Sequence, residues 1–233
     1  MVISLALAVV LAAGVFFAVI YGELRKAADD DPRVWEPDIA RFEAEDRKHP
    51  PPKDAVVFVG SSSIRFWHSL AEDMAPLVTI RRGFGGSRIN DVVHYAGRLI
   101  TNYHPSKVVV FVGSNDINVS DNPMAAVTDI AAGLERLVGI ILAARADTEI
   151  YYIAITPTRY SWHKRDAVQA ANEAAEAVMA KHPQTHFIAT WDLFLDESGE
   201  PDRDLYWLDG LHLSEEGYRR WTERIRPILM SDR

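Results

Sequence analysis

Three polar residues carry side chains suited to nucleophilic chemistry. Ser62 offers a hydroxyl group, and Asp209 and His212 stand three residues apart near the other end of the chain. A serine hydroxyl is a weak nucleophile at neutral pH until a base accepts its proton, and a histidine base needs a partner on its second ring nitrogen. The three residues therefore fit attack by Ser62 on an acyl carbonyl, with His212 as the base and Asp209 as its partner.

Such an attack builds negative charge on the carbonyl oxygen, which preorganised hydrogen-bond donors stabilise. The N–H groups of Ser62 and Gly86 and the side-chain amide of Asn115 are the candidate donors. Glycine suits the second position, because a substrate approaches the backbone there without meeting a side chain. Asparagine suits the third, because its amide is a neutral donor. We expect these groups to form an oxyanion hole, and Asp116 to be a structural hydrogen-bonding group.

The candidate residues follow segments that are expected to be strands. An unbroken apolar run at 55–59 ends in Gly60. A similar run at 108–112 ends in the polar turn 113–116. Such runs are typical of strands buried on both faces. Because parallel strands end at one edge of a sheet, where open α/β sheets place their sites, we expect five residues to converge there: Ser62, Gly86, Asn115, Asp209 and His212.

The remaining elements alternate in the manner of an α/β protein. Further strands are expected at 78–80, 150–155 and 186–189. Apolar residues at helical spacing predict helices at 89–103, 123–145 and 166–181, and a closing helix capped by Ser214. This alternation implies right-handed crossovers and a parallel five-stranded sheet covered on both faces, which is a three-layer α/β/α sandwich.

The chain divides into three expected regions. Residues 2–21 contain no charged side chain, and about 20 such residues cross roughly 30 Å of hydrocarbon as a helix. We expect 1–22 to be an N-terminal membrane anchor rather than a cleaved signal segment, because no basic residue precedes the apolar run. Residues 23–52 are expected to form a linker and a short surface helix, and residues 53–233 the functional domain.

This N-terminal segment predicts a protein that is membrane-anchored or exported. Arg25, Lys26 and Arg33 follow the apolar run, and by the positive-inside rule they keep the domain in the cytoplasm. A true start that lies upstream and supplies basic residues would invert that orientation, so the side of the membrane stays open.

Composition narrows the range of partners and cofactors. The 233 residues include 25 basic and 33 acidic ones, for a net charge of -8, with no long basic run, which disfavours nucleic acid as a partner. The absence of cysteine excludes disulfides, thiolate nucleophiles and cysteine-based metal sites. The other histidines lack a paired metal-ligand spacing. No metal or other cofactor is therefore expected.

Aromatic residues near these turns have two competing interpretations. The loop after the expected fourth strand carries Tyr160, Trp162 and His163, which are candidates to line a substrate pocket, although exposure on the surface is an equal alternative. Three other aromatic residues are expected to pack in the core: Phe66, Trp67 and Trp207.

Four short blocks resemble the signature blocks of the SGNH hydrolases, also called GDSL esterases and lipases. They are Gly-Ser-Ser at 60–62, Gly-Phe-Gly-Gly at 83–86, Gly-Ser-Asn-Asp at 113–116 and Asp-Gly-Leu-His at 209–212, in the order of that family. The family usually has aspartate at the position of Ser61. The resemblance implies a flavodoxin-like fold with five parallel strands. It also implies that Ser62 is the nucleophile and that Gly86 and Asn115 are oxyanion donors. By the same resemblance Asp209 and His212 complete the catalytic triad.

The leading hypothesis is a serine esterase that hydrolyses short-chain carboxylic esters through an acyl-enzyme. A carbohydrate O-acetylesterase is the alternative within the same chemistry. A flavin- or nucleotide-binding module is the rival from another class, because a serine-rich turn between a strand and a helix can bind phosphate. That rival leaves Asn115 and the Asp209/His212 pair without a role, and the chain lacks the Gly-Lys of a phosphate-binding loop. A catalytically silent scaffold at a membrane is the third possibility.

Overall fold

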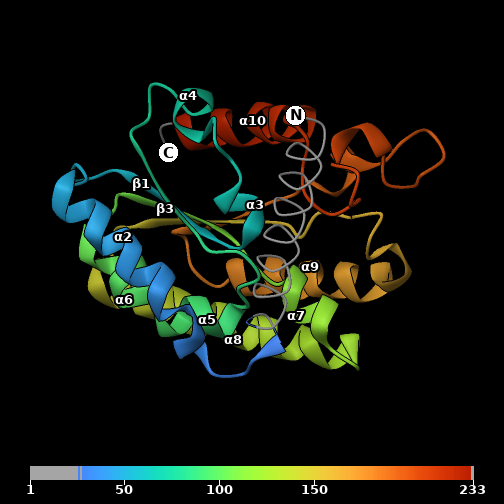
Figure 1. Ribbon diagram of the computed structural model, residues 1–233, viewed down its shortest axis with the longest axis horizontal. Helices are drawn as coiled ribbons and strands as arrows, with labels where there is room; N and C mark the ends of the chain where they lie inside the picture. The colour runs from blue at the N-terminus through green and yellow to red at the C-terminus, as the bar shows by residue number, and fades with distance from the viewer. Residues whose placement is uncertain (1–25, 27, 232–233) are drawn as a thin grey trace, which may run out of the picture.

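The computed structural model describes residue 26 and residues 28–231 (Figure 1). A five-stranded, all-parallel sheet with strand order β2-β1-β3-β4-β5 runs through its centre. Its strands are β1 (Val56–Gly60), β2 (Thr79–Gly83), β3 (Lys107–Phe111), β4 (Glu149–Ile153) and β5 (Thr185–Ile188). The expected strand count and parallel pairing are thus confirmed, with boundaries displaced by one to a few residues.

Burial explains the strand sequences. All five residues of β1 are buried, and β1 lies between β2 and β3, which accounts for its continuous apolar run. The edge strand β2 extends to Gly83 and includes Arg81 and Arg82, although a shorter strand was expected. Arg82 tolerates this position because its guanidinium donates to the Asp46 carboxylate and the Tyr103 hydroxyl.

Helices cover both faces of the sheet and complete three layers (Figure 1). One face packs in one apolar cluster against α2 (Glu36–Lys48), α5 (Ile89–His94), α6 (Ala96–Leu99), α8 (Pro123–Ala144) and α9 (Arg165–Met179). The opposite face packs in a second cluster against α3 (Ser62–Arg65), α4 (Leu70–Asp73) and α10 (Glu215–Met230). The expected α/β/α sandwich is therefore confirmed. A further helix, α7 (Ser114–Val119), follows β3, and the 3-10 turns are η1 (Pro32–Trp35), η2 (Thr101–Tyr103), η3 (Trp162–Lys164), η4 (Trp191–Phe194) and η5 (Arg203–Leu205).

Two expected helices differ in detail from the structure. The helix expected at 89–103 is divided into α5, α6 and η2, with Tyr95 at the junction of α5 and α6. Helix α2, expected to be a surface helix, buries Ile39 and Phe42 in the main core together with the preceding Trp35. Its apolar face is part of the packing of the sheet, while its charged face remains outside.

The closing helix begins where its sequence predicts. The Ser214 hydroxyl accepts a hydrogen bond from the Gly217 N–H at 3.2 Å, and Glu215 and Glu216 occupy the first turn. The expected N-terminal anchor at 1–22 lies outside the described residues. Within the described part of the chain, no helix combines the length and apolar character needed to cross a membrane.

Candidate active site

A sharp turn at the end of β1 presents Ser62. Gly60 has φ +149°, and a Cβ atom there would lie 1.9 Å from the carbonyl oxygen of Phe111. Only glycine fits such an approach between neighbouring strands. The next residue, Ser61, is 1% exposed and its N–H donates to that same Phe111 oxygen at 3.1 Å. Ser62 then begins the single-turn helix α3 with its hydroxyl at the carboxyl edge of the sheet.

The turn before α10 brings two of the expected partners to this hydroxyl. His212 Nε2 lies 3.1 Å from Ser62 Oγ, across 150 positions of sequence. His212 Nδ1 lies 2.7 Å from Asp209 Oδ2. The other carboxylate oxygen of Asp209 accepts the N–H groups of Leu211 at 2.9 Å and His212 at 3.0 Å. These contacts fix the Asp209 carboxylate and turn the imidazole toward Ser62, which is the geometry of a serine nucleophile with its base.

The charge of Asp209 is maintained by its hydrogen bonds. Partial burial raises the pKa of this carboxyl, but the bonds accepted from the His212 ring and from the N–H groups of Leu211 and His212 outweigh that effect. The net pKa of Asp209 is below its ordinary value. An ionised Asp209 can accept a hydrogen bond from an Nδ1–H of His212, and in that tautomer Nε2 is the acceptor nitrogen that faces Ser62.

The expected oxyanion donors lie on neighbouring turns. Gly86 adopts φ +80° in the turn after β2, and Asn115 stands in the first turn of α7, after Gly113 at φ +117°. One amide hydrogen of Asn115 bonds the Ser87 carbonyl at 3.0 Å, so the two turns are linked directly. The amide carries a second hydrogen, which can bind another acceptor.

A small cavity adjoins Ser62. Its volume is about 10 Å³, which is close to the smallest space that holds one water molecule. Asn115, Thr156 and Thr158 line it beside Ser62, and the Thr156 hydroxyl is buried without a partner among the described residues. Ser62 and Asn115 therefore line one confined space.

The loop after β4 does not deliver the expected pocket residues to this space. Tyr160 is 57% exposed, and its N–H donates to Gly210 O at 3.0 Å. Trp162 stacks on Trp191 with ring centroids 6.0 Å apart, and His163 is exposed. None of the three lines the cavity beside Ser62 or the larger pocket next to His212. The loop supports the turn of Asp209 and His212 from outside.

Two aromatic residues that were expected in the core contact His212: Phe66 does so while it packs against the edge of the core, and Trp207 lies outside the core. The rings of Phe66 and Trp207 contact the His212 ring, with centroid distances of 5.0 and 5.5 Å. Trp207 is 45% exposed and Phe66 is half-buried. Trp67, in contrast, is fully buried as expected. Sequence offered one signal for Trp207, namely its position two residues before the Asp209 turn.

No metal site accompanies these residues in the described part of the chain, where no cluster of three or more histidine, aspartate or glutamate side chains could hold an ion. The site instead consists of a hydroxyl, an imidazole, a carboxylate and amide donors.

The parallel sheet flanked by helices and the family match place this chain among the hydrolases of the SGNH type. The chain belongs to the GDSL-like Lipase/Acylhydrolase family, whose profile matches residues 58–220. It is accordingly a carboxylic ester hydrolase. No functionally curated protein matches the sequence.

Solved structures of low sequence identity share the fold. A protein from Streptococcus pneumonia whose name refers to platelet activating factor is 18% identical, with a TM-score of 0.72 over 94% of this chain and 99% of its own. A GDSL-like lipase from Bacteroides thetaiotaomicron is 19% identical, with a TM-score of 0.62 over 82% and 96%. A mutant acetylxylan esterase from Geobacillus stearothermophilus is 13% identical, with a TM-score of 0.61 over 78% and 96%.

Proposed function

We propose that the protein hydrolyses short-chain carboxylic esters with Ser62 as nucleophile, His212 as general base and acid, and Asp209 as the partner of His212. The observation that carries this proposal is the continuous chain of contacts from Ser62 Oγ to His212 Nε2 at 3.1 Å and from His212 Nδ1 to Asp209 at 2.7 Å.

The reaction proceeds in two halves. Ser62 Oγ bonds to the acyl carbon while His212 Nε2 takes the hydroxyl proton, and the resulting oxyanion is stabilised by the N–H groups of Ser62 and Gly86 and the Asn115 amide. The ester C–O bond then breaks, and His212 gives its proton to the leaving alcohol. Water attacks the acyl-enzyme, His212 takes the water proton and returns it to Ser62, and a carboxylic acid is released.

The small cavity favours short acyl groups. It adjoins Ser62 and Asn115 and has barely the space of one water molecule, so the smallest acyl groups, such as acetyl, displace its walls least. A longer acyl chain would have to lie outside it or displace Leu211 and Leu213. We therefore expect kcat/KM to fall as the acyl chain lengthens.

An O-acetylated carbohydrate is the second candidate substrate. A structural neighbour is an acetylxylan esterase, and the observation on this chain that favours a sugar is the partly exposed ring of Trp207 beside His212.

Hydrolysis of p-nitrophenyl esters from acetate to long chains, compared between the unsubstituted protein and Ser62→Ala, tests the proposal. We expect turnover that is highest on acetate and roughly 10⁴- to 10⁶-fold lower in the variant. Ser61→Ala and Ser63→Ala should each change kcat by less than about tenfold, which separates the nucleophile from its neighbours. Full activity in Ser62→Ala would overturn the assignment, and copurification of a flavin or nucleotide without turnover would favour a binding module.

A further inference from the structure

Large apolar side chains that are exposed gather at one edge of the sheet. Five of the eight such side chains in the described part of the chain lie in segments that follow β3 and β4 or precede α10: Val119, Met124, Tyr160, Trp207 and Leu208. The other three lie singly elsewhere: Val78 before β2, Ile140 in α8 and Met230 at the end of α10. Single exposed apolar side chains are ordinary, but a group of them around one site is typical of an interaction surface.

The segments that carry these five side chains form one rim beside Ser62, which we call the active-site rim: residues 113–124, 156–164 and 206–213. Each of the three segments contributes to the lining of the small cavity beside Ser62. The Tyr160 N–H donates to Gly210 O at 3.0 Å, which joins the second segment to the third. Lys164 Nζ donates to two carbonyl oxygens near the end of α7, at 2.9 and 3.0 Å, which joins the second segment to the first. The exposed apolar side chains therefore belong to one connected surface.

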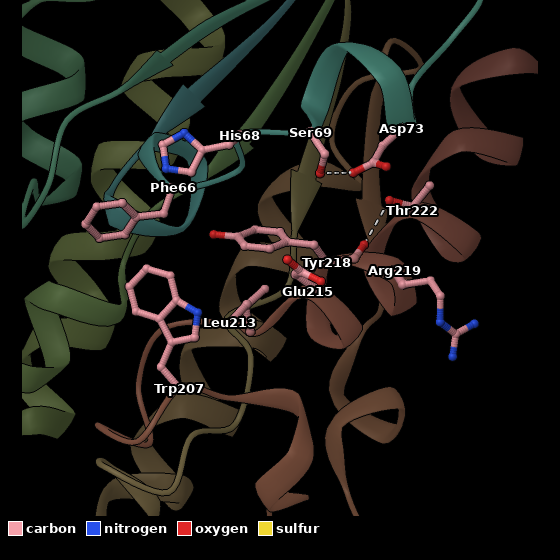
Figure 2. A pocket seen from close by; sticks show the side chains of 10 residues that line it. All are labelled: Phe66, His68, Ser69, Asp73, Trp207, Leu213, Glu215, Tyr218, Arg219 and Thr222. Carbon is pink, nitrogen blue, oxygen red and sulfur yellow. Dashed lines mark hydrogen bonds between the residues drawn. The ribbon is translucent and has the colours of Figure 1, made fainter.

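Trp207 is held in this rim with part of its indole exposed. Figure 2 shows its ring beside Phe66, at one end of the pocket next to α10. The two ring centroids are 5.3 Å apart, and Trp207 is still 45% exposed. Tryptophan and tyrosine are enriched where a membrane meets water, because each joins an apolar ring to a polar group. Trp207 and the 57% exposed Tyr160 give the rim this composition.

The described chain begins next to the same rim. Arg88, in the turn after β2, donates to the Asp30 carboxylate at 2.8 Å and to the main-chain oxygen of Asp29. Ala28 and Asp30 line a pocket of about 500 Å³ together with Val119 of the rim. Figure 1 shows this first segment, in dark blue, beside α7 and α8. The start of the described chain is therefore fixed to the carboxyl edge of the sheet.

A membrane span just before this point would bring the rim to the bilayer. The Lys26 ammonium lies 2.9 Å from the Asp38 carboxylate and 5.0 Å from the centre of the Trp35 ring, and Lys26 O accepts the Asp29 N–H at 3.1 Å. The expected anchor ends at residue 22, and the four residues from there to Lys26 reach at most about 14 Å. The anchor would therefore hold the carboxyl edge near the bilayer.

The charges of the rim fit a zwitterionic lipid surface. Its basic residues Arg159 and Lys164 are balanced by Asp121 and Asp209, and the remaining carboxyl, Asp116, is buried. An excess of basic residues is what draws a protein surface to anionic lipids. The rim has no such excess, so its attraction to a bilayer would come from its apolar and aromatic side chains.

We propose that the active-site rim lies on the headgroup region of the bilayer that residues 1–22 of the same chain enter. The carboxyl edge of the sheet then faces the bilayer, and the opposite edge faces the water. Met124 and Leu208 enter between the headgroups, and Tyr160 and Trp207 lie at their level. The inference rests on the expected anchor and is independent of which ester the site hydrolyses.

The test measures the depth of fluorescent labels on the full chain in phosphatidylcholine vesicles. The sequence has no cysteine, so Leu208→Cys and Met124→Cys can each carry one nitrobenzoxadiazole label without background. Val78→Cys is the matched control, because Val78 is 57% and Met124 55% exposed, and Val78 precedes β2 at the opposite edge of the sheet. We expect nitroxide groups on the lipids to quench both rim labels at least about threefold more than the control label, because interfacial side chains lie within the headgroup and acyl boundary.

Each other outcome would overturn a stated part of the proposal. Equal quenching of the rim and control labels would refute the orientation. Rim labels with blue-shifted emission that lipid nitroxides do not quench would show that protein, either residues 1–25 or a second copy, covers the rim. A full chain that does not float with the vesicles would refute the anchor and the rim together. The near-ultraviolet circular dichroism of each variant confirms its folding, and the two rim labels are read independently of each other.

Discussion

The Asp116 carboxylate accepts the main-chain N–H of Ile89, with each of its oxygens 3.2 Å from that nitrogen. The preceding side chain, Asn115, bonds the Ser87 carbonyl at 3.0 Å. Two consecutive side chains of α7 therefore hold the turn that carries Gly86. This arrangement supports the expected structural role of Asp116 and fixes one proposed oxyanion donor relative to another.

Removal of the Asn115 amide should weaken oxyanion stabilisation and also free the turn at Ser87. We expect Asn115→Ala to lower kcat by about 10²- to 10³-fold with a smaller change in KM. Steady-state kinetics on p-nitrophenyl acetate measures this effect. Asn118→Ala, in the same helix, is the matched control and should stay within about twofold of the unsubstituted protein. Full activity in Asn115→Ala would show that the Asn115 amide is not an oxyanion donor.

Burial of Asp116 should make folding stability depend on pH. Burial raises the pKa of this carboxyl from 3.8 to about 7. Between pH 3.8 and about 7 the folded chain keeps a proton on Asp116 that the unfolded chain has lost. The stability that Asp116 contributes is therefore greatest below pH 3.8, the pKa in the unfolded chain, and declines as pH rises toward 7. Asp116→Asn should flatten that decline, because asparagine stays neutral and can still accept the Ile89 N–H. The measurement is the urea unfolding midpoint of the unsubstituted protein and of Asp116→Asn at pH 4 to 8. Midpoints that change with pH in parallel in the two proteins would contradict a raised pKa of Asp116.

Asp209 should change the pH dependence of folding stability in the opposite direction to Asp116. Its pKa is lowered, so the stability from its contacts is present above the unfolded value of 3.8 and is lost only as pH falls through the lower folded value. The carboxylate is thus ionised at neutral pH. We expect Asp209→Asn to lower kcat at pH 7 by roughly 10²- to 10⁴-fold, because the amide no longer enforces the required histidine tautomer. Retention of most activity would show that His212 is oriented by other groups.

The turn at Gly60 should not tolerate a side chain. A methyl group there would meet Phe111 O at 1.9 Å, so Gly60→Ala is expected to destabilise the protein by more than about 3 kcal/mol. Gly139→Ala is the matched control, because a Cβ atom at this exposed position of α8 meets nothing within 4 Å. That change should stabilise the protein by about 0.5–1 kcal/mol. The urea midpoints of the two variants should therefore move in opposite directions.

The features that follow from parallel strand topology were predicted best from the sequence. Apolar runs identified the buried strands, and parallel pairing then required their polar ends to share one edge. This reasoning placed Ser62, Asn115 and His212 together although 150 positions separate the first from the last. The resemblance of four blocks to one family added the roles, and the family match at 58–220 confirmed the membership.

The aromatic surroundings of the site could not be predicted in the same way. Trp67 and Trp207 are the same residue type, yet one is fully buried and the other is 45% exposed. Their difference depends on how the turns around them fold. The sequence left two alternatives for the loop with Tyr160, because proximity to a strand end does not specify the direction of a loop. In the structure Tyr160 is exposed, and Trp162 stacks on Trp191 instead of entering the site.

The segment from Tyr206 to Leu213 closes on itself, because these two residues form an antiparallel bridge and the Trp207 N–H donates to His212 O at 2.8 Å. Asp209, His212 and the Trp207 indole therefore belong to one hydrogen-bonded turn, and any displacement of this turn would move all three together relative to Ser62.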